Sequence, residues 1–208
     1  PRNADDYDRM ILESFHMPVI VRHYGYDIPH EEMIRKQERN LNLLVKSIGE
    51  TEGMDDYIYF QIGQSQLTLS GAQEAIEAYE KAMEHIPGLE KYYVPELIMS
   101  LANTYADAGR VPDALALMEK YAKDFNTAKY VHTYANILWK DEQVLKALGN
   151  YIKVTTLPDM GTLGGELTDC YGRIIQIYEA FGEKEMAENF HQRFLAYHAD
   201  KERVTGAE

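Results

Sequence analysis

The chain has 208 residues, of which 45% are hydrophobic and 26% charged, and its formal net charge is −13. These proportions are those of an ordinary globular protein, and the acidic balance argues against attraction to nucleic acid or to an anionic membrane. A single cysteine, Cys170, excludes an internal disulfide and favours a reducing, cytoplasmic location. No apolar run approaches the roughly 18 residues that a membrane-spanning helix needs.

The first part of the chain differs in pattern from the rest. Residues 10–15 and 17–24 are apolar and partly β-branched, which predicts short strands in a segment at 1–29. Because residue 1 is proline, we expect this segment to be the remnant of a preceding domain. A helix is predicted from about His30 to Gly49, with apolar residues at helical spacing. We expect residues 30–54 to cap the helical array that follows.

Residues 56–87 show the clearest motif in the chain. They form two predicted helices separated by a turn at Ser70–Gly71, with Gly63 on the first helix and Ala75 on the second. Small residues at these two places let the helices cross at close range. The small residue of the first helix recurs three more times, with one departure, at Ala102, Ala135 and Ile175. The second-helix alanine recurs at Ala114, Ala147 and Ala187.

This spacing resembles that of tetratricopeptide (TPR) repeats, which have a period of about 34 residues. The resemblance implies an all-α fold: a right-handed superhelix of about four helix-turn-helix repeats over residues 55–200, followed by a polar tail at 201–208. Turn-rich insertions at 88–92 and 157–166 fall between repeats. We expect the last helix to run from Lys184 to about His198.

Candidate binding residues lie on the first helices, which line the concave face of such a superhelix. The position after the small residue is always a carboxamide: Gln64, Asn103, Asn136 and Gln176. Each carboxamide offers a donor and an acceptor, so a ladder of them could pair with the backbone of an extended peptide. The alternative is an ordinary solvated position that the repeat keeps polar.

Other residues are predicted to surround this ladder on the concave face. They are Tyr57, Phe60, Glu96, Met99, His132, Trp139, Lys140, Asp169 and Glu179. Trp139, the only tryptophan, would anchor an apolar side chain if exposed, or would pack under the next repeat. Since the groove lacks a repeated Lys/Arg pattern, we do not expect it to clamp a C-terminal carboxylate.

A second resemblance concerns residues 18–44. An apolar strand ends in His-Tyr-Gly-Tyr (residues 23–26), and a helix then carries Arg-Asn-Leu (residues 39–41). Together with the repeats, this is similar to the C-terminal end of bacterial family-2 glycosyltransferases. The resemblance implies a catalytic domain before Pro1 that binds a nucleotide-sugar and Mn²⁺ or Mg²⁺, and His23 matches a histidine near that metal. Leu12–Glu13 stands where the family often has His-Glu.

Two functional hypotheses follow. In the first, the chain is a protein- or peptide-binding and assembly module, without catalysis or cofactor of its own, belonging to a glycosyltransferase. In the second, it is part of an active transferase whose repeats position a protein acceptor or form a dimer. A homodimer could use the N-terminal strand or the repeats. Neither hypothesis involves nucleic acid or a membrane.

Overall fold

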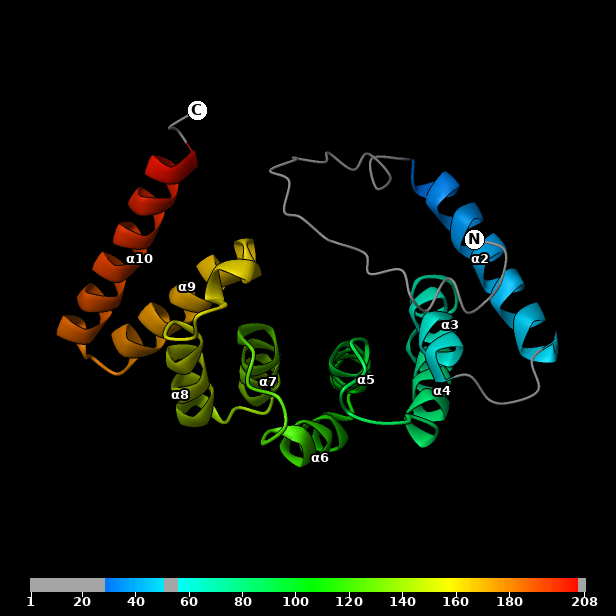
Figure 1. The fold of residues 1–208 in the computed structure, drawn as a ribbon. Helices are drawn as coiled ribbons and strands as arrows, with labels where there is room; N and C mark the ends of the chain where they lie inside the picture. Colours follow the sequence, from blue (N-terminus) through cyan, green and yellow to red (C-terminus); the bar gives the residue numbers. More distant parts are fainter. Residues whose placement is uncertain (1–28, 51–55, 206–208) are drawn as a thin grey trace, which may run out of the picture. The chain divides into compact units, whose positions relative to one another are not determined.

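The computed structural model describes residues 29–50 and 56–205 (Figure 1). Within these ranges the chain is helical and contains no strand. The predicted strands at 10–15 and 17–24 lie outside the described residues. Backbone contacts divide the chain into Pro1–Met33 and Ile34–Glu208. Helix α2 (His30–Glu50) confirms the helix that was predicted from His30 to Gly49.

The second unit contains the predicted helical hairpins, each made of two successive helices joined by a short turn. Their helices are α3 (Asp56–Leu69), α4 (Ala72–Glu84), α5 (Val94–Asp107), α6 (Val111–Tyr121), α7 (Ala128–Lys140), α8 (Val144–Val154), α9 (Gly165–Ala180) and α10 (Lys184–Thr205). Contacts of α4 with α5, of α5 and α6 with α7, and of α8 with α9 join each hairpin to the next. Helix α10 continues past the predicted end at His198 to Thr205.

Small residues allow the two helices of a hairpin to approach closely. A Cβ atom placed on Gly63 would lie only 2.4 Å from two carbons of the Tyr79 ring, which is itself buried. Ala102 on α5 and Ala114 on α6 are both fully buried, as are the equivalent alanines of the third hairpin. The sequence motif therefore reflects a steric requirement at the crossings of the first three hairpins, whereas the fourth has Ile175 in this place.

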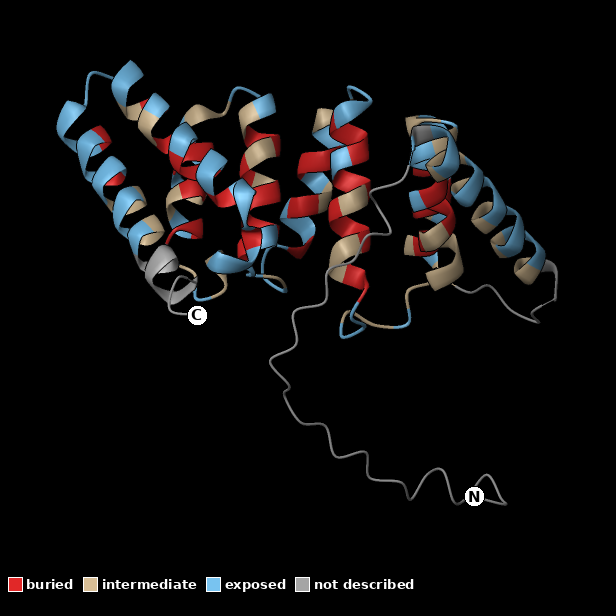
Figure 2. Cartoon of the chain, turned by 90° about the horizontal axis from the view of Figure 1, so that it is seen from above, coloured by how far each residue is buried: buried red, intermediate tan, exposed pale blue. Residues whose placement is uncertain are grey.

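The large side chains of the second helices fill the space beside these crossings. Tyr79, Met118 and Tyr151 are at most 1% exposed, whereas His191, their counterpart on α10, is exposed. The hydroxyl of Tyr130 donates to the backbone oxygen of Met118 at 2.7 Å, which links α7 to α6. Figure 2 shows burial concentrated in the middle helices and sparse on α10. The core is therefore continuous across hairpins, as a repeat fold requires.

The turns inside three hairpins share one geometry. Gly109 and Gly182 follow the first helices with φ of 79° and 78°, in the left-handed region that glycine tolerates. In the third hairpin Glu142 takes this place with φ of 59°. Its turn keeps the same closing bond, in which the amide of Gln143 donates to the oxygen of Leu138 at 3.0 Å. The third turn therefore carries backbone strain that the others avoid.

The predicted insertions lie between hairpins, except that residues 165–166 of the second begin α9, and this second insertion has a structural role. It contains the short 3₁₀ helix η2 (Met160–Leu163), which contacts α7 and α9. Just before it, a carboxylate oxygen of Asp159 accepts from the amide of Ala128 at 2.9 Å. The side chain of Thr127 accepts from the amide of Tyr130 at 3.3 Å. Two caps thus satisfy the start of α7, one of them from the insertion between the third and fourth hairpins.

Candidate functional site

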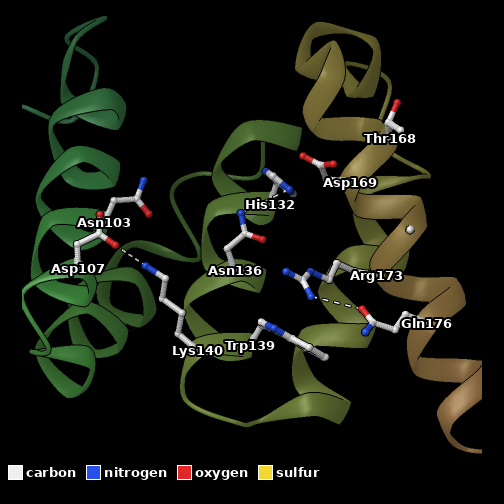
Figure 3. A pocket seen from close by; sticks show the side chains of 11 residues that line it. Asn103, Asp107, His132, Asn136, Trp139, Lys140, Thr168, Asp169, Arg173 and Gln176 are labelled. Carbon is white, nitrogen blue, oxygen red and sulfur yellow. Dashed lines mark hydrogen bonds and ion pairs between the residues drawn. The ribbon is translucent and has the colours of Figure 1, made fainter.

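The first helices of three consecutive hairpins, α5, α7 and α9, line an open cavity of about 820 Å³ (Figure 3). Its lining is mainly polar and carries charges of both signs. The lining residues are Asn103, Asp107, His132, Asn136, Trp139, Lys140, Thr168, Asp169, Gly172, Arg173 and Gln176. This mixture of carboxamides, paired charges and one indole suits a ligand with hydrogen-bonding groups along its length.

Three of the four predicted carboxamides come together in this cavity. Asn103 and Gln176 are exposed at its two sides, and Asn136 is half-buried between them on α7. Gln64 is exposed on α3 and is not among the lining residues. The ladder is therefore a cluster of three carboxamides over α5, α7 and α9, with Gln64 apart from it.

Asn136 is held in one orientation by its neighbours. The hydroxyl of Tyr151 donates to its Oδ1 at 2.7 Å, and its Nδ2 lies 3.5 Å from Nε2 of His132. Burial raises the pKa of Tyr151 to about 12, so this hydroxyl remains a donor at neutral pH. The Asn136 amide group therefore points its nitrogen toward the histidine, and the second N–H of that nitrogen remains for a ligand.

His132, which contacts Asn136, is a buried residue. Its side chain is 9% exposed, and Nδ1 lies 3.7 Å from a carboxylate oxygen of Glu166. Burial lowers the pKa of His132, and the carboxylates of Glu166 and Asp169 oppose that effect. A neutral ring that accepts from Asn136 at Nε2 carries its proton on Nδ1, the nitrogen that faces Glu166. His132 was predicted to face a ligand; the structure makes it mainly a support for Asn136.

Trp139 and Arg173 form the aromatic side of the cavity. The guanidinium carbon of Arg173 lies 4.9 Å from the centroid of the Trp139 ring, within cation–π range. A guanidinium nitrogen also lies 3.4 Å from the side-chain oxygen of Gln176. Trp139 is half-buried and lines the cavity, so it combines the two predicted roles of packing and exposure.

Two ion pairs connect α5 to α7 along the cavity and beside it. Lys140 pairs with Asp107, and Lys129 contacts Glu96 at 2.7 Å. In both pairs the lysine follows the acid by 33 residues, so each joins equivalent turns of neighbouring repeats. Because all four side chains are exposed, each pair contributes little to stability, at most about 1 kcal/mol. Lys140 lines the cavity as predicted, but its charge is already matched by Asp107.

Besides Gln64, the predicted binding residues Tyr57, Phe60 and Met99 do not line the cavity. Phe60 and Met99 are 3% and 5% exposed, so they belong to the core and the prediction of a ligand contact is wrong for both. The Phe60 ring lies 6.1 Å from that of Tyr93, which covers it from the segment before α5. Tyr57 is half-buried, with its ring 5.0 Å from that of Tyr93, and does not line the cavity.

Four lining residues were missed: Asp107, Thr168, Gly172 and Arg173. The 33-residue offset from Lys140 could have indicated Asp107 as an acid on the same face. Arg173 had no such signal, because the residues two places before Ala102 and Ala135 are Ser100 and Thr133. Only the fourth repeat carries a long cationic side chain there.

The described residues contain no cluster of metal ligands and no reactive thiol near this cavity. Across residues 29–50 and 56–205, no three His, Cys, Asp or Glu side chains gather as metal ligands. His23 lies outside the described part. Cys170 is buried and burial raises its pKa to about 12, so its thiol is unreactive at neutral pH. No helix in the described ranges has the length and apolar character needed to cross a membrane.

Comparison with known proteins identifies the fold. No protein family model matches the chain, and no curated protein matches it by sequence. Among solved structures, MamA from Desulfovibrio magneticus RS-1 superposes with a TM-score of 0.62 and 16% identity, over 82% of this chain and 91% of that one. The TPR-like repeats of a Podosopora anserina putative kinesin light chain give 0.58 and 18%, over 88% and 100%.

YrrB, described as a TPR protein with an unusual peptide-binding site, gives a TM-score of 0.55 and 19% identity, over 82% of this chain and 86% of that one. The fold is TPR-like. At these identities the likeness concerns the fold alone. It agrees with the repeat register that Gly63, Ala102 and Ala135 set in the sequence.

Proposed function

We propose that this TPR-like chain is a protein-interaction module that binds an extended peptide across α5, α7 and α9. The observation that carries the proposal is the convergence of Asn103, Asn136 and Gln176 on one open cavity. Carboxamides recognise backbone amides and carbonyls without regard to side chains, which suits an extended segment. The fold of YrrB, a TPR protein with a peptide-binding site, gives further support.

The three carboxamides would contribute unequally. Asn136 is already oriented by Tyr151 and His132, so it loses little conformational freedom when a peptide binds. The side chain of Asn103 is exposed and makes no hydrogen bond within the described residues, so it must be ordered by the ligand. We therefore expect Asn136 to be the central contact and Asn103 to extend it toward α5.

The test begins with a random peptide library displayed on phage and selected on the wild-type protein. One selected peptide, labelled with fluorescein, then reports affinity by anisotropy. Replacing Asn136 with Ala should weaken binding about 15-fold and replacing Asn103 about 5-fold, the effects of one or two lost hydrogen bonds. Helicity measured by circular dichroism should not change.

Two substitutions serve as controls for this test. Asn189 is exposed on α10 and Gln64 on α3, and neither lines the cavity. Alanine at either place should leave affinity unchanged. Failure to select any peptide, or full affinity in the Asn103→Ala, Asn136→Ala double variant, would overturn the proposal.

A second proposal rests on the sequence of residues 18–44. Their similarity to the end of family-2 glycosyltransferases suggests that the repeats position a protein acceptor, or a second subunit, for such an enzyme. The described residues do not supply a cation site, since they hold no cluster of metal ligands. The nucleotide-sugar and its cation would therefore need residues outside the described part.

The test of this second proposal is the sequence of the intact gene product. An Asp-x-Asp motif that follows an apolar strand, about 100–200 residues before Pro1 as one catalytic domain requires, would support it. Absence of such a domain would refute it and leave the peptide-binding proposal untouched.

A further inference from the structure

The charges that line the cavity are not all matched. Lys140 is paired with Asp107. Arg173 has no carboxylate within 4 Å in the part of the chain that the structure describes. Asp169 stands four residues earlier on α9, a spacing that commonly gives a helical ion pair, yet the two side chains do not pair. In Figure 3 the guanidinium of Arg173 extends instead toward Trp139.

Arg173 is nevertheless held in position. Its guanidinium lies over the Trp139 ring at 4.9 Å and contacts the Gln176 side-chain oxygen at 3.4 Å. These contacts engage one face and one edge of the planar group. A guanidinium has five N–H groups, so these contacts leave others for a ligand, and Arg173 lines the cavity. The group is thus oriented before any ligand arrives.

Arg110 offers a comparison with Arg173, because it also stacks on an aromatic ring but has carboxylate partners. Its guanidinium lies 4.2 Å from the centroid of the Tyr105 ring, a comparable stacking contact. Asp113 at 2.7 Å and Glu80 at 3.6 Å both neutralise it, and the Asp113 carboxylate chiefly raises its pKa. Arg110 is a structural arginine, whereas Arg173 has the stacking partner without the carboxylates.

Space for a ligand group exists beside Arg173. The preceding residue, Gly172, lines the cavity, and a Cβ atom placed on it would meet nothing within 4 Å. The cavity is therefore open beside α9 at Gly172, and Arg173 lines the same cavity. Exposed donors in a fixed fork match the two oxygens of a carboxylate and can bind it in a bidentate manner.

We propose that the peptide bound in this cavity carries one acidic side chain whose carboxylate pairs with Arg173 against Trp139. This inference rests on the proposed peptide-binding function and names the chemistry of its partner. The rest of the cavity limits that chemistry to a single acid. Asp169 is an unmatched carboxylate nearby, and the chain as a whole carries −13, so a run of acidic residues would be repelled.

The experiment uses the same displayed library, selected separately on wild type and on Arg173→Gln. Peptides selected on wild type should share Asp or Glu at one position, and those selected on the variant should not. Replacing that acid with its amide should weaken binding to wild type about 10-fold and have no effect on binding to Arg173→Gln. Arg173→Lys keeps the charge without the planar fork and should give an intermediate affinity.

Lys153→Gln provides the matched control, because it removes one positive charge from the exposed face of α8 outside the cavity. It should behave as wild type. Selected peptides without a shared acid would overturn the inference and leave the peptide-binding proposal intact. An acid whose amide replacement costs as much in Arg173→Gln as in wild type would also overturn it. If no peptide is selected at all, both proposals fall.

Discussion

Gly63→Ala tests the steric basis of the repeat directly. The added methyl would lie 2.4 Å from two carbons of the Tyr79 ring, far inside ordinary contact distance. The ring cannot move aside easily, because it is 1% exposed and its centroid lies 6.1 Å from that of Phe60. Overpacking of this kind costs about 1–3 kcal/mol, and so close a contact places the cost near the upper value.

An opposing effect must be subtracted from that cost. Alanine is favoured over glycine inside a helix by about 1 kcal/mol. The net loss of unfolding free energy should therefore be about 2 kcal/mol, which lowers Tm by roughly 4–8 °C in a chain of this size. Gly149→Ala on α8 is the matched control, because its methyl would meet nothing within 4 Å. It should gain about 1 kcal/mol from the same helix preference.

Urea unfolding followed by circular dichroism and by Trp139 fluorescence measures both variants. Since repeats can unfold separately, Gly63→Ala should affect the dichroism more than the fluorescence, which reports the third hairpin. In a Tyr79→Leu background the ring is absent, and Gly63→Ala should become neutral or stabilising. If Gly63→Ala stabilises wild type as much as Gly149→Ala does, the close-crossing argument is wrong.

Three other substitutions probe separate features. Glu142→Gly should raise Tm, with a gain of about 0.5–1 kcal/mol, because it relieves a left-handed backbone at φ of 59°; a lower Tm in thermal unfolding would contradict this. Asp159→Ala should cost about 1 kcal/mol and speed hydrogen exchange at the Ala128 amide that it caps, whereas unchanged exchange would remove its capping role. His132 has a lowered pKa in the fold, so the unfolded chain takes up the proton first and stability should fall as pH drops below about 6.5. The loss should level off below the folded pKa, and His132→Gln should reduce the pH dependence of urea midpoints across that window; an equal slope in the variant would contradict the assignment.

The features that could be predicted from the sequence are those that depend on local sterics and on the repeat period. Gly63 and Ala75 indicated a close helix crossing, and the same spacing located the other hairpins and the carboxamides of α5, α7 and α9. These inferences succeed because a repeat places equivalent residues in equivalent surroundings. The insertion predicted at 157–166 does lie between hairpins, apart from residues 165–166, which begin α9, and its capping contact from Asp159 to α7 was not foreseen.

The failures concern contacts between repeats. Phe60 and Met99 are three places before the small residue and were predicted to be exposed, but Tyr93 covers Phe60 and Met99 is buried in the core. The burial of such a side chain depends on how neighbouring hairpins pack together. This packing cannot be predicted from the sequence of a single repeat. Arg173 was missed because its importance comes from the Trp139 ring on another helix and from the absence of a pairing carboxylate.

Cys170 and Trp139 make the protein convenient to study by optical methods. The only thiol is buried, donates to the Tyr151 backbone oxygen and has a pKa near 12, so maleimide reagents should not label the native wild type. A cysteine introduced at any exposed position could then carry a dye without background labelling. The only indole borders the cavity. Its emission can therefore report occupancy, and energy transfer to such a dye can report distance, in an otherwise unmodified chain.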